Sequence, residues 1–363
     1  MWLSLIIISI IYIPYFLVIR GVGRLWINMD IEDPESFSED IVQFSVVIPF
    51  RNEKSNLSQL IKRLNEQLDS WSEVILVDDH SSDGGESEVA AFIQDLPNFK
   101  LILNNGEGKK DALTSGIDYS ANSWIVTLDA DVRISATWGK EILKRIDGQD
   151  DMVILPVTLE NDRSVLQKFD VFDFLILQGF TFCYARNRKP FLANGAHLAF
   201  KKSTWNEVNG YSSHNYLASG DDVFLLESFK KHGKIISWEW SKELTVRTSV
   251  NSDFNSFIKQ RIRWGSKTSK LDSKELKTLS VLILAANSAL LVLLATGYWQ
   301  SFFLALLVKS VVDINFSLPV LISYQRKDLI KFLPLFIFLY PFYITFVGIA
   351  TLVVKPTWKG RKI

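Results

Sequence analysis

The sequence has little of what disulfide-bonded or nucleic-acid-binding proteins need. Cys183 is the only cysteine in 363 residues, which excludes an intramolecular disulfide and agrees with a reducing compartment. No charge of one sign prevails, because 40 basic residues balance 40 acidic ones, so the composition gives no reason to expect nucleic acid or another polyanion as a partner. Histidine is scarce, and no second His or Cys stands at ligand spacing from His197, which argues against a histidine–cysteine metal site.

Charged residues are also missing from the first segment, Trp2 to Ile19, which is about long enough to cross a hydrocarbon core. The segment lacks a basic n-region and a small-x-small cleavage site, so a retained anchor is a better interpretation than a removed signal peptide. Arg20 and Arg24 follow it directly, which predicts that the next domain lies in the cytoplasm. We expect residues 1–24 to be a transmembrane anchor in the inner membrane.

The sequence becomes membrane-like again in residues 275–363, where three apolar stretches predict two or three spans. Lys309 and Asp313 stand one helical turn apart inside the second stretch and should face the helix bundle, as a packing pair rather than as a contact to an acceptor or headgroup. The positive-inside rule predicts that the basic loop 325–327 and the basic tail 355–362 both lie on the cytoplasmic side. If the last apolar stretch crosses the membrane once, however, they must lie on opposite sides. Either the last stretch is re-entrant or kinked at Pro341, or the rule fails for the tail.

Residues 39–274 have the composition of a soluble domain with interfacial helices. Apolar runs predict buried strands at 44–49, 73–79, 99–103 and 124–128, and helical patterns lie between them. Alternation of strands and helices at these lengths predicts an α/β domain with a mostly parallel, doubly wound sheet. The carboxyl ends of such strands meet at one edge, where nucleotides bind.

Two carboxylates end the fourth predicted strand, in the sequence Asp129-Ala130-Asp131. Hard divalent cations such as Mg²⁺ or Mn²⁺ take oxygen ligands there and keep other positions free for substrate phosphates. The motif alone is common, and acidic pairs are often only solvated. It gains weight because further polar segments follow the other predicted strands.

Five segments in order carry a resemblance to a known family: Pro49-Phe50-Arg51-Asn52-Glu53, Asp78-Asp79-His80-Ser81, Asp129-Ala130-Asp131, Ser219-Gly220-Asp221-Asp222 and Gln260-Arg261-Ile262-Arg263-Trp264. Together they resemble the inverting family 2 glycosyltransferases of the GT-A fold, over roughly residues 44–264. The last segment matches the family's Gln-x-x-Arg-Trp signature in full. The resemblance implies a GT-A domain, an α/β Rossmann-like fold, flanked here by transmembrane helices.

The resemblance places the donor nucleotide at the ends of the first strands. It implies that Pro49, Glu53 and Asp79, with Asp78 beside them, hold the nucleoside, since carboxylates accept hydrogen bonds from uracil and ribose. Asp78 and Asp79 could instead stabilise a turn. Lys109, in a segment similar to the family's Gly-Lys-x-x-Ala-Leu, would approach the nucleotide as a point charge.

The remaining roles follow from the same resemblance. Asp131 and Asp129 would hold a divalent metal on the diphosphate, and Asp129 would also contact the donor nucleotide. The diphosphate and acceptor side is assigned to Gln260, Arg261, Arg263 and Trp264, where Arg263 would bind phosphate and Trp264 would stack on a sugar or headgroup. The same segment could simply be an amphipathic interfacial helix.

The resemblance further implies that Asp222 is the catalytic base, because an inverting transfer needs one carboxylate to take the acceptor hydroxyl's proton. Asp221 would support the acceptor or the loop. An acidic pair at this place could also only cap the helix that follows. Gly195 and His197 belong to a segment similar to the one that lines the family's sugar pocket, and His197 could instead be structural.

These observations predict a membrane glycosyltransferase that uses a nucleotide diphosphate sugar, most simply a UDP-sugar, and transfers the sugar to a lipid or lipid-linked acceptor at the cytoplasmic face. The expected partners are that donor, that acceptor and the bilayer, with an oligomer or biosynthetic complex left open and no nucleic acid. Two alternatives remain. One is a processive polysaccharide synthase, although about four membrane segments are few for a polymer channel, and the other is a non-catalytic scaffold that binds nucleotide or lipid.

Overall fold

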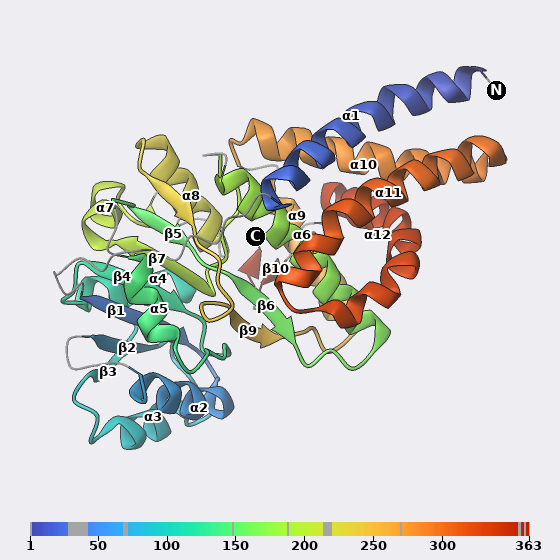
Figure 1. The fold of residues 1–363 in the computed structure, drawn as a ribbon. Coiled ribbons are helices and arrows are strands. Elements are labelled where there is room, and N and C mark those ends of the chain that lie inside the picture. Colours follow the sequence, from blue (N-terminus) through green and yellow to red (C-terminus); the bar gives the residue numbers. More distant parts are fainter. Residues whose placement is uncertain are drawn as a thin grey trace. The chain divides into compact units, whose positions relative to one another are not determined.

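The fold was obtained as a computed structural model, which describes residues 2–27, 43–67, 72–146, 149–186, 189–212, 220–268, 271–354, 357–358 and 361–362 (Figure 1). The chain divides into two compact units. Residues 31–161 and 192–249 form one, here called the sheet unit. Residues 1–30, 162–191 and 250–363 form the other, here called the helical unit. Residues 162–191 and 250–274 thus group with the apolar helices, whereas the sequence analysis counted them within residues 39–274, a domain expected to include interfacial helices.

The sheet unit is built on a seven-stranded sheet in the order β3-β2-β1-β4-β7-β5-β8. The strands are β1 (Phe44–Phe50), β2 (Glu73–Asp78), β3 (Phe99–Leu103), β4 (Trp124–Leu128), β5 (Met152–Ile154), β7 (His197–Lys201) and β8 (Ile236–Trp238). β3, β2, β1 and β4 pair in parallel, β7 runs antiparallel between β4 and β5, and β5 pairs in parallel with β8. The predicted α/β sheet is confirmed over its first four strands.

The central strands are buried along their whole length. Every residue of β1, β2 and β4 is buried, as expected of parallel strands that are covered on both faces and therefore read as continuous apolar runs. The register sets Phe50 beside Asp78 and Leu128 beside His197. The ends of β1, β2 and β4 and the start of β7 therefore share one edge of the sheet.

Helices and a short second sheet complete the described part of the sheet unit. The helices are α2 (Lys54–Asn65), α3 (Gly85–Ile93), α4 (Lys109–Tyr119), α5 (Trp138–Arg145), α7 (Lys202–Glu207) and α8 (Asp221–Lys231). α4 packs against β1 and β2, and a Cβ at Gly116 would meet Val47 at 2.5 Å, so only glycine allows this close approach. β6 (Val157–Glu160) pairs in parallel with β9 (Val246–Ser249).

The helical unit contains the membrane-like segments. Its helices are α1 (Trp2–Ile27), α6 (Val165–Arg186), α9 (Phe254–Thr268), α10 (Lys274–Ala295), α11 (Trp299–Ser323), η2 (Lys327–Phe332) and α12 (Leu333–Val353), and a short pair, β10 (Thr357–Trp358) and β11 (Arg361–Lys362), follows. α1 packs along α11 and α10, α6 packs against α1 and α11, and α9 and α10 each pack against α12. α12 continues through Pro341 as one helix.

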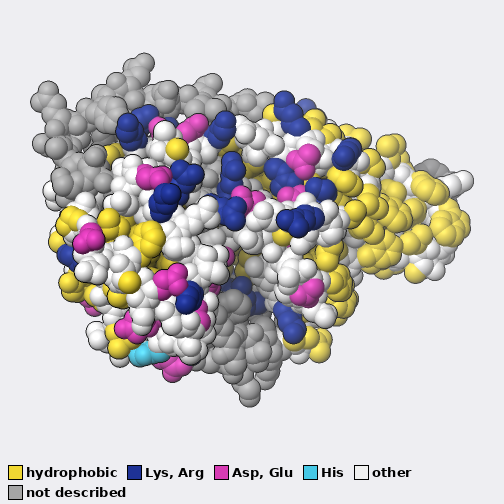
Figure 2. Space-filling model, turned by 90° about the horizontal axis from the view of Figure 1, so that it is seen from below, with side chains coloured by type: hydrophobic (Ala, Val, Ile, Leu, Met, Phe, Trp, Pro, Cys, Tyr) yellow, Lys and Arg dark blue, Asp and Glu magenta, His cyan; other side chains and the backbone are white. Residues whose placement is uncertain are grey.

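Among the described residues, three helical segments are long and apolar enough to cross a membrane, namely Lys274–Ala295, Trp299–Ser323 and Lys327–Val353. Many of their large hydrophobic side chains are exposed, among them Leu307 and Leu352, and Figure 2 shows a hydrophobic surface that continues over this part of the chain. Inside the bundle, Lys309 is fully buried and pairs with Asp313, whose other carboxylate oxygen accepts a hydrogen bond from Tyr15 at 2.6 Å. This geometry matches the packing pair predicted from the sequence.

Candidate active site

Two carboxylates contact the ammonium group of Lys109 at the carboxyl edge of the sheet. Lys109 is the first residue of α4, and its Nζ lies 2.6 Å from Oδ1 of Asp129, just after β4, and 3.4 Å from Oδ2 of Asp221, at the start of α8. Asp131 and Asp222 each stand beside one of these partners in sequence. A single cation thus joins the end of β4 to the first turn of α8, so residues almost 100 positions apart form one site.

Glycines permit this approach of three elements. Gly108 and Gly220 precede α4 and α8 with φ of +101° and +95°, conformations that side chains rarely adopt. A Cβ at Gly195 would lie 2.9 Å from a carboxylate oxygen of Asp221 and 3.5 Å from Nζ of Lys109. Gly195 therefore lies beside Asp221 and Lys109, and its lack of a side chain is what allows the loop before β7 to approach α8.

The electrostatics of the cluster follow from its burial. Burial raises the pKa of Asp129, and the neighbouring Asp131 and Asp221 raise it further, while Lys109 opposes them. Burial alone would lower the pKa of Lys109, but the carboxylates of Asp129 and Asp221 outweigh it, so the pKa is raised and the ammonium keeps its proton. The site therefore holds a permanent cation within a group of acids.

Asp131 is the member of the Asp-x-Asp pair that fits a metal ligand. Its carboxylate is exposed, and one oxygen accepts a hydrogen bond from Oγ1 of Thr248 in β9 at 2.8 Å, which orients the group while leaving lone pairs available. Asp129 faces Lys109 instead. The described residues contain no ready cluster of three or more His, Cys, Asp or Glu for a metal. A cation here would need oxygen ligands from a substrate, as Mg²⁺ commonly takes from phosphates.

Asp222 is held by backbone amides at the start of α8. Its Oδ2 accepts a hydrogen bond from the Gly195 N–H at 3.2 Å, and its Oδ1 accepts one from the Val223 N–H at 2.8 Å. The first turn of a helix also favours carboxylates, because the helix dipole is positive there. Each oxygen keeps a further lone pair, so Asp222 is fixed in position and still able to accept a proton. Ser219, which opens this motif, lies outside the described residues.

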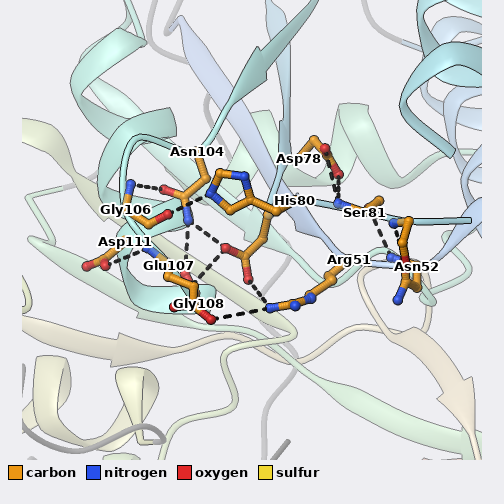
Figure 3. Close-up of polar contacts among 12 residues, drawn as sticks. Arg51, Asn52, Asp78, His80, Ser81, Asn104, Gly106, Glu107, Gly108 and Asp111 are labelled. Carbon is orange, nitrogen blue, oxygen red and sulfur yellow. Dashed lines mark hydrogen bonds and ion pairs between the residues drawn. The ribbon is translucent and has the colours of Figure 1, made fainter. Parts of the chain in front are cut away.

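The loops after β1, β2 and β3 are tied together by polar contacts (Figure 3). Oδ1 of Asp79 accepts hydrogen bonds from Nδ2 of Asn104 and from the Gly108 N–H, both at 2.7 Å. Its Oδ2 lies 3.8 Å from the guanidinium of Arg51, which also reaches Glu107 at 3.9 Å. Asp79 thus fixes the loop that leads into Lys109, and one of its oxygens is directed toward Arg51.

Asp78 has a turn role in this structure. Both of its carboxylate oxygens accept from the Ser81 N–H, at 3.1 and 3.3 Å, and the residue is buried (Figure 3). The turn places His80 at a positive φ of 58°. Glu53 precedes α2 and accepts a hydrogen bond from Nδ2 of Asn56 at 2.8 Å, and Pro49 is a buried residue of β1. These three residues support the loops rather than present free polar groups.

His197 is not a sugar ligand in this structure. It is fully buried: its Nε2 accepts a hydrogen bond from Nε1 of Trp138 at 3.0 Å, and its Nδ1 lies 3.2 Å from the Pro156 carbonyl, to which it donates. Burial lowers the pKa of His197 to about 3, so the ring is neutral, as this pattern of one donor and one acceptor requires. The sugar-pocket assignment is therefore wrong for this side chain, and its structural alternative is correct.

The Gln260–Trp264 segment lies on α9 in the helical unit, and its first arginine is structural. Arg261 is buried and its guanidinium pairs with Asp170 at 2.5 Å and with Asp173 at 2.6 Å, both on α6. The rings of Phe257 and Trp264 lie over the same guanidinium at 4.8 and 4.4 Å. A group used in this way cannot also bind a diphosphate, so the assignment of Arg261 to the substrate is wrong.

The neighbours of Arg261 in this segment differ in their surroundings. Oε1 of Gln260 accepts hydrogen bonds from Arg261 at 2.6 Å and from Nδ2 of Asn251 at 2.9 Å, so Gln260 extends the buried network. Arg263 and Trp264 are half-buried. Of the four residues in this prediction, Arg263 is the one whose exposure and charge together still suit a phosphate contact.

Sequence reasoning missed several polar residues of the site. Arg51 and Asn104 contact Asp79, yet neither stood out in the sequence, because an arginine and an asparagine in polar loops are usually only solvated. Tyr211 is buried, and its pKa is raised by burial and then by the carboxylate of Asp221, which places its hydroxyl in the field of the acidic cluster. No pattern in the sequence could have linked Tyr211 to residues of α8.

This arrangement agrees with comparisons with known proteins. Residues 45–203 match the family model described as Glycosyl transferase family 2. This region is therefore similar to that family, over less than half of the chain. The match covers β1 to β7 and includes Lys109, Asp129, Asp131 and Gly195, while Asp222 lies beyond it.

Curated relatives share shorter regions. The chain is 40% identical over 100 residues to the undecaprenyl-phosphate 4-deoxy-4-formamido-L-arabinose transferase of Proteus mirabilis, which covers 26% of this chain and 31% of that protein. It is 33% identical over 130 residues to the enzyme of the same name from Edwardsiella ictaluri, covering 34% of this chain and 39% of the relative. The chain thus matches less than half the length of these relatives.

A solved structure extends the likeness over the whole chain. The mannosyltransferase PcManGT from Pyrobaculum calidifontis, in complex with GDP-Man and Mn²⁺, aligns with 96% of this chain and 98% of its own, with a TM-score of 0.59 and 16% sequence identity. At this identity the likeness shows the fold alone. It confirms the predicted GT-A type of α/β domain flanked by apolar helices.

Proposed function

We propose that the protein is a membrane glycosyltransferase that moves a sugar from a nucleotide diphosphate donor to a lipid or lipid-linked acceptor, with inversion and with help from a divalent cation. The observation that carries the proposal is the pairing of Lys109 with both Asp129 and Asp221, which brings Asp131 and Asp222, their neighbours in sequence, to the same site. The family 2 match over residues 45–203 supports the reaction class. The apolar helices and the names of the relatives, which act on undecaprenyl phosphate, support a lipid acceptor.

The donor side of the proposal uses the edge between β1, β2 and β4. Arg51 and Asp79 would face the nucleoside, because their side chains lie at the ends of β1 and β2 beside the loop that leads into Lys109. Mg²⁺ or Mn²⁺ would be held by Asp131, with Asp129 as its neighbour, and would supply Lewis-acid stabilisation of the departing diphosphate. Lys109 would hold the carboxylates of Asp129 and Asp221 in position through its positive charge.

The acceptor side uses the first turn of α8. Asp222 is fixed by two backbone N–H groups and would take the proton of an acceptor hydroxyl as its oxygen attacks the anomeric carbon. Asp221 would hold the loop through its contact with Lys109. The positive-inside rule, applied to Arg20 and Arg24, supports a cytoplasmic location for this chemistry.

Release of nucleoside diphosphate by the purified full chain, measured with a panel of nucleotide sugars with and without EDTA, tests the reaction class. We expect one donor to be consumed in a metal-dependent manner when lipid acceptor is present. An intact, folded chain that releases nothing from any donor would favour the scaffold alternative. A ladder of products instead of a single added sugar would favour the processive synthase.

The Asp222→Asn variant separates two kinds of acceptor. A hydroxyl acceptor needs a base, and general base catalysis contributes about 10²–10⁴-fold, so the variant should lose that much activity. A lipid phosphate is already ionised near neutral pH, because its second pKa is about 6, and would need no base, so the loss should be small. Binding of the donor nucleotide should be preserved in both cases, and a variant that loses it would contradict the assignment.

A further inference from the structure

A basic cavity is lined on one side by the proposed metal ligand Asp131 and otherwise by residues to which the proposed transfer gives no role. Its volume is about 260 Å³, and it lies between α2, the loop after the Asp-x-Asp pair and the strand pair β6–β9. Its charged lining consists of Arg63, Arg133, Lys242, Arg247, Asp131 and Glu160. Four cations face two acids, so the walls carry an excess of positive charge.

Few of these charges are neutralised within the protein. Arg133 pairs with Glu160 at 3.0 Å, and Arg63 pairs with Glu66 at 3.2 Å outside the cavity. Among the described residues, no carboxylate lies within 4.0 Å of the charged groups of Lys242 or Arg247. Lys242 and Arg247, to which the described residues supply no acidic partner, therefore line a cavity that has room for a ligand.

The backbone itself brings like charges together. Arg133 and Arg247 form an isolated antiparallel bridge, in which each N–H donates to the other's carbonyl, at 2.7 and 3.0 Å. Residues paired in this way project their side chains to the same side of the ladder, and like charges directly opposite one another are destabilising. Glu160 compensates for only one of the two arginines. A bound anion would compensate for the other.

We infer that this cavity is a binding site for a phosphate group, held by Arg133, Lys242 and Arg247. Guanidinium groups match phosphate oxygens through paired, charge-assisted hydrogen bonds, which favours phosphate over a small halide. The volume is below the 300–1,000 Å³ or so that drug-sized ligands fill, which suits a phosphate or headgroup better than a complete nucleotide sugar. The phosphate could belong to a lipid headgroup or be free in solution, and the site does not require the transfer reaction.

Direct binding to the purified full chain in neutral detergent tests the inference. Binding of inorganic phosphate and pyrophosphate would be measured by titration calorimetry in the presence of EDTA. EDTA removes divalent cations, so a metal-dependent donor site does not contribute to the binding signal. The Lys242→Ala/Arg247→Ala variant should bind at least about tenfold more weakly, since each hydrogen bond to a charged group contributes enough for such a loss. The Lys62→Ala/Lys140→Ala variant removes two exposed lysines outside the cavity and should bind like the wild type.

A second variant makes the result independent of folding. Glu160→Gln removes an acid from the wall and releases Arg133, so phosphate should bind several-fold more tightly. Damage to the fold cannot both weaken binding in one variant and strengthen it in the other. Equal binding by the wild type and the Lys242→Ala/Arg247→Ala variant, or no binding to any of the proteins, would overturn the inference.

Competition identifies the source of the phosphate. If dodecyl phosphate displaces pyrophosphate in the wild type, the site accepts a lipid phosphate, and if it does not, the site is for free phosphate; both outcomes retain the site. The measurement needs neither donor nor turnover. An inactive chain that binds phosphate through Arg247 would contradict the proposed transfer alone, and an active chain without such binding would contradict this inference alone.

Discussion

Replacement of Arg261 by methionine tests whether the first arginine of the Gln-x-x-Arg-Trp segment is structural. The guanidinium pairs with Asp170 and Asp173, which are 1% and 2% exposed, while Arg261 itself is 3% exposed. Methionine has a similar length but no charge. The variant would leave two carboxylates buried without their cation, in the interface between α6 and α9.

The expected loss of stability can be estimated from this geometry. Removal of one partner from a buried ion pair costs about 3–5 kcal/mol, because the other charge stays desolvated and uncompensated. The hydroxyls of Tyr340 and Tyr343 on α12 still donate to Asp173, at 3.1 and 2.9 Å, which keeps the cost within this range although two acids are affected. In a unit of this size each 1 kcal/mol lowers the melting temperature by about 2–4 °C, so the loss should be about 6–20 °C.

Thermal unfolding of the full chain in neutral detergent, followed by tryptophan fluorescence, measures this loss. Arg263→Met is the matched control, since Arg263 lies on the same helix and is half-buried, and it should melt within a few degrees of the wild type while losing transfer activity. Arg261→Lys should be intermediate, because an ammonium cannot pair with both carboxylates through a planar fork.

A compensating variant sharpens the test. When Asp170→Asn and Asp173→Asn are added to Arg261→Met, no uncompensated charge remains, and a large part of the lost stability should return. If Arg261→Met melts at the temperature of the wild type and loses only activity, the reasoning is refuted, and the motif prediction that Arg261 binds substrate would be restored.

Three further predictions concern the sheet unit. Lys109→Met should raise the pKa of Asp129 further and weaken donor binding about tenfold or more. Initial rates should show the acid limb of the pH–rate profile at higher pH, and an unchanged profile would contradict the ion pair between Lys109 and Asp129. Gly195→Ala should lower kcat by roughly 10–100-fold with little change in melting temperature, because its Cβ would displace Asp221, and full activity would disprove the close approach. The lowered pKa of His197, about 3, means that only the unfolded chain binds this proton between about pH 6.5 and 3, so the free energy of unfolding should fall by about 2 kcal/mol on going to pH 5, while His197→Gln should show a flatter profile.

The fold was predictable where local patterns decide it. The apolar runs of β1, β2 and β4 are buried along their whole length, so composition alone identifies them as central parallel strands. Alternation with helices then brings their carboxyl ends to one edge. The boundary between the two units is harder to predict, because a run rich in aromatic residues, such as that of α6, suits a protein core and a helix at the membrane interface equally well.

The candidate site was predictable in its residue types and less so in its contacts. A sequence shows that Asp129 ends a strand and that Asp221 starts a helix, but only the packed structure shows that Lys109 joins them. His197 shows the same limit in the opposite direction. Its motif favoured a ligand, and its surroundings, Trp138 and the Pro156 carbonyl, make it part of the core.

The sequence by itself determined the class of the protein, its strand order along the chain and the acids available for chemistry, because hydrophobic periodicity and strand ends are local properties. The tertiary structure alone decided which charged groups are buried and paired. It showed that Arg261 links α6 and α9 through buried ion pairs, whereas Lys109 contacts the carboxylates of the candidate active site. It also showed that Arg133 lies opposite Arg247. The physical reason is that the energy of a charge depends on its burial and its neighbours, and those come from residues far away in the sequence.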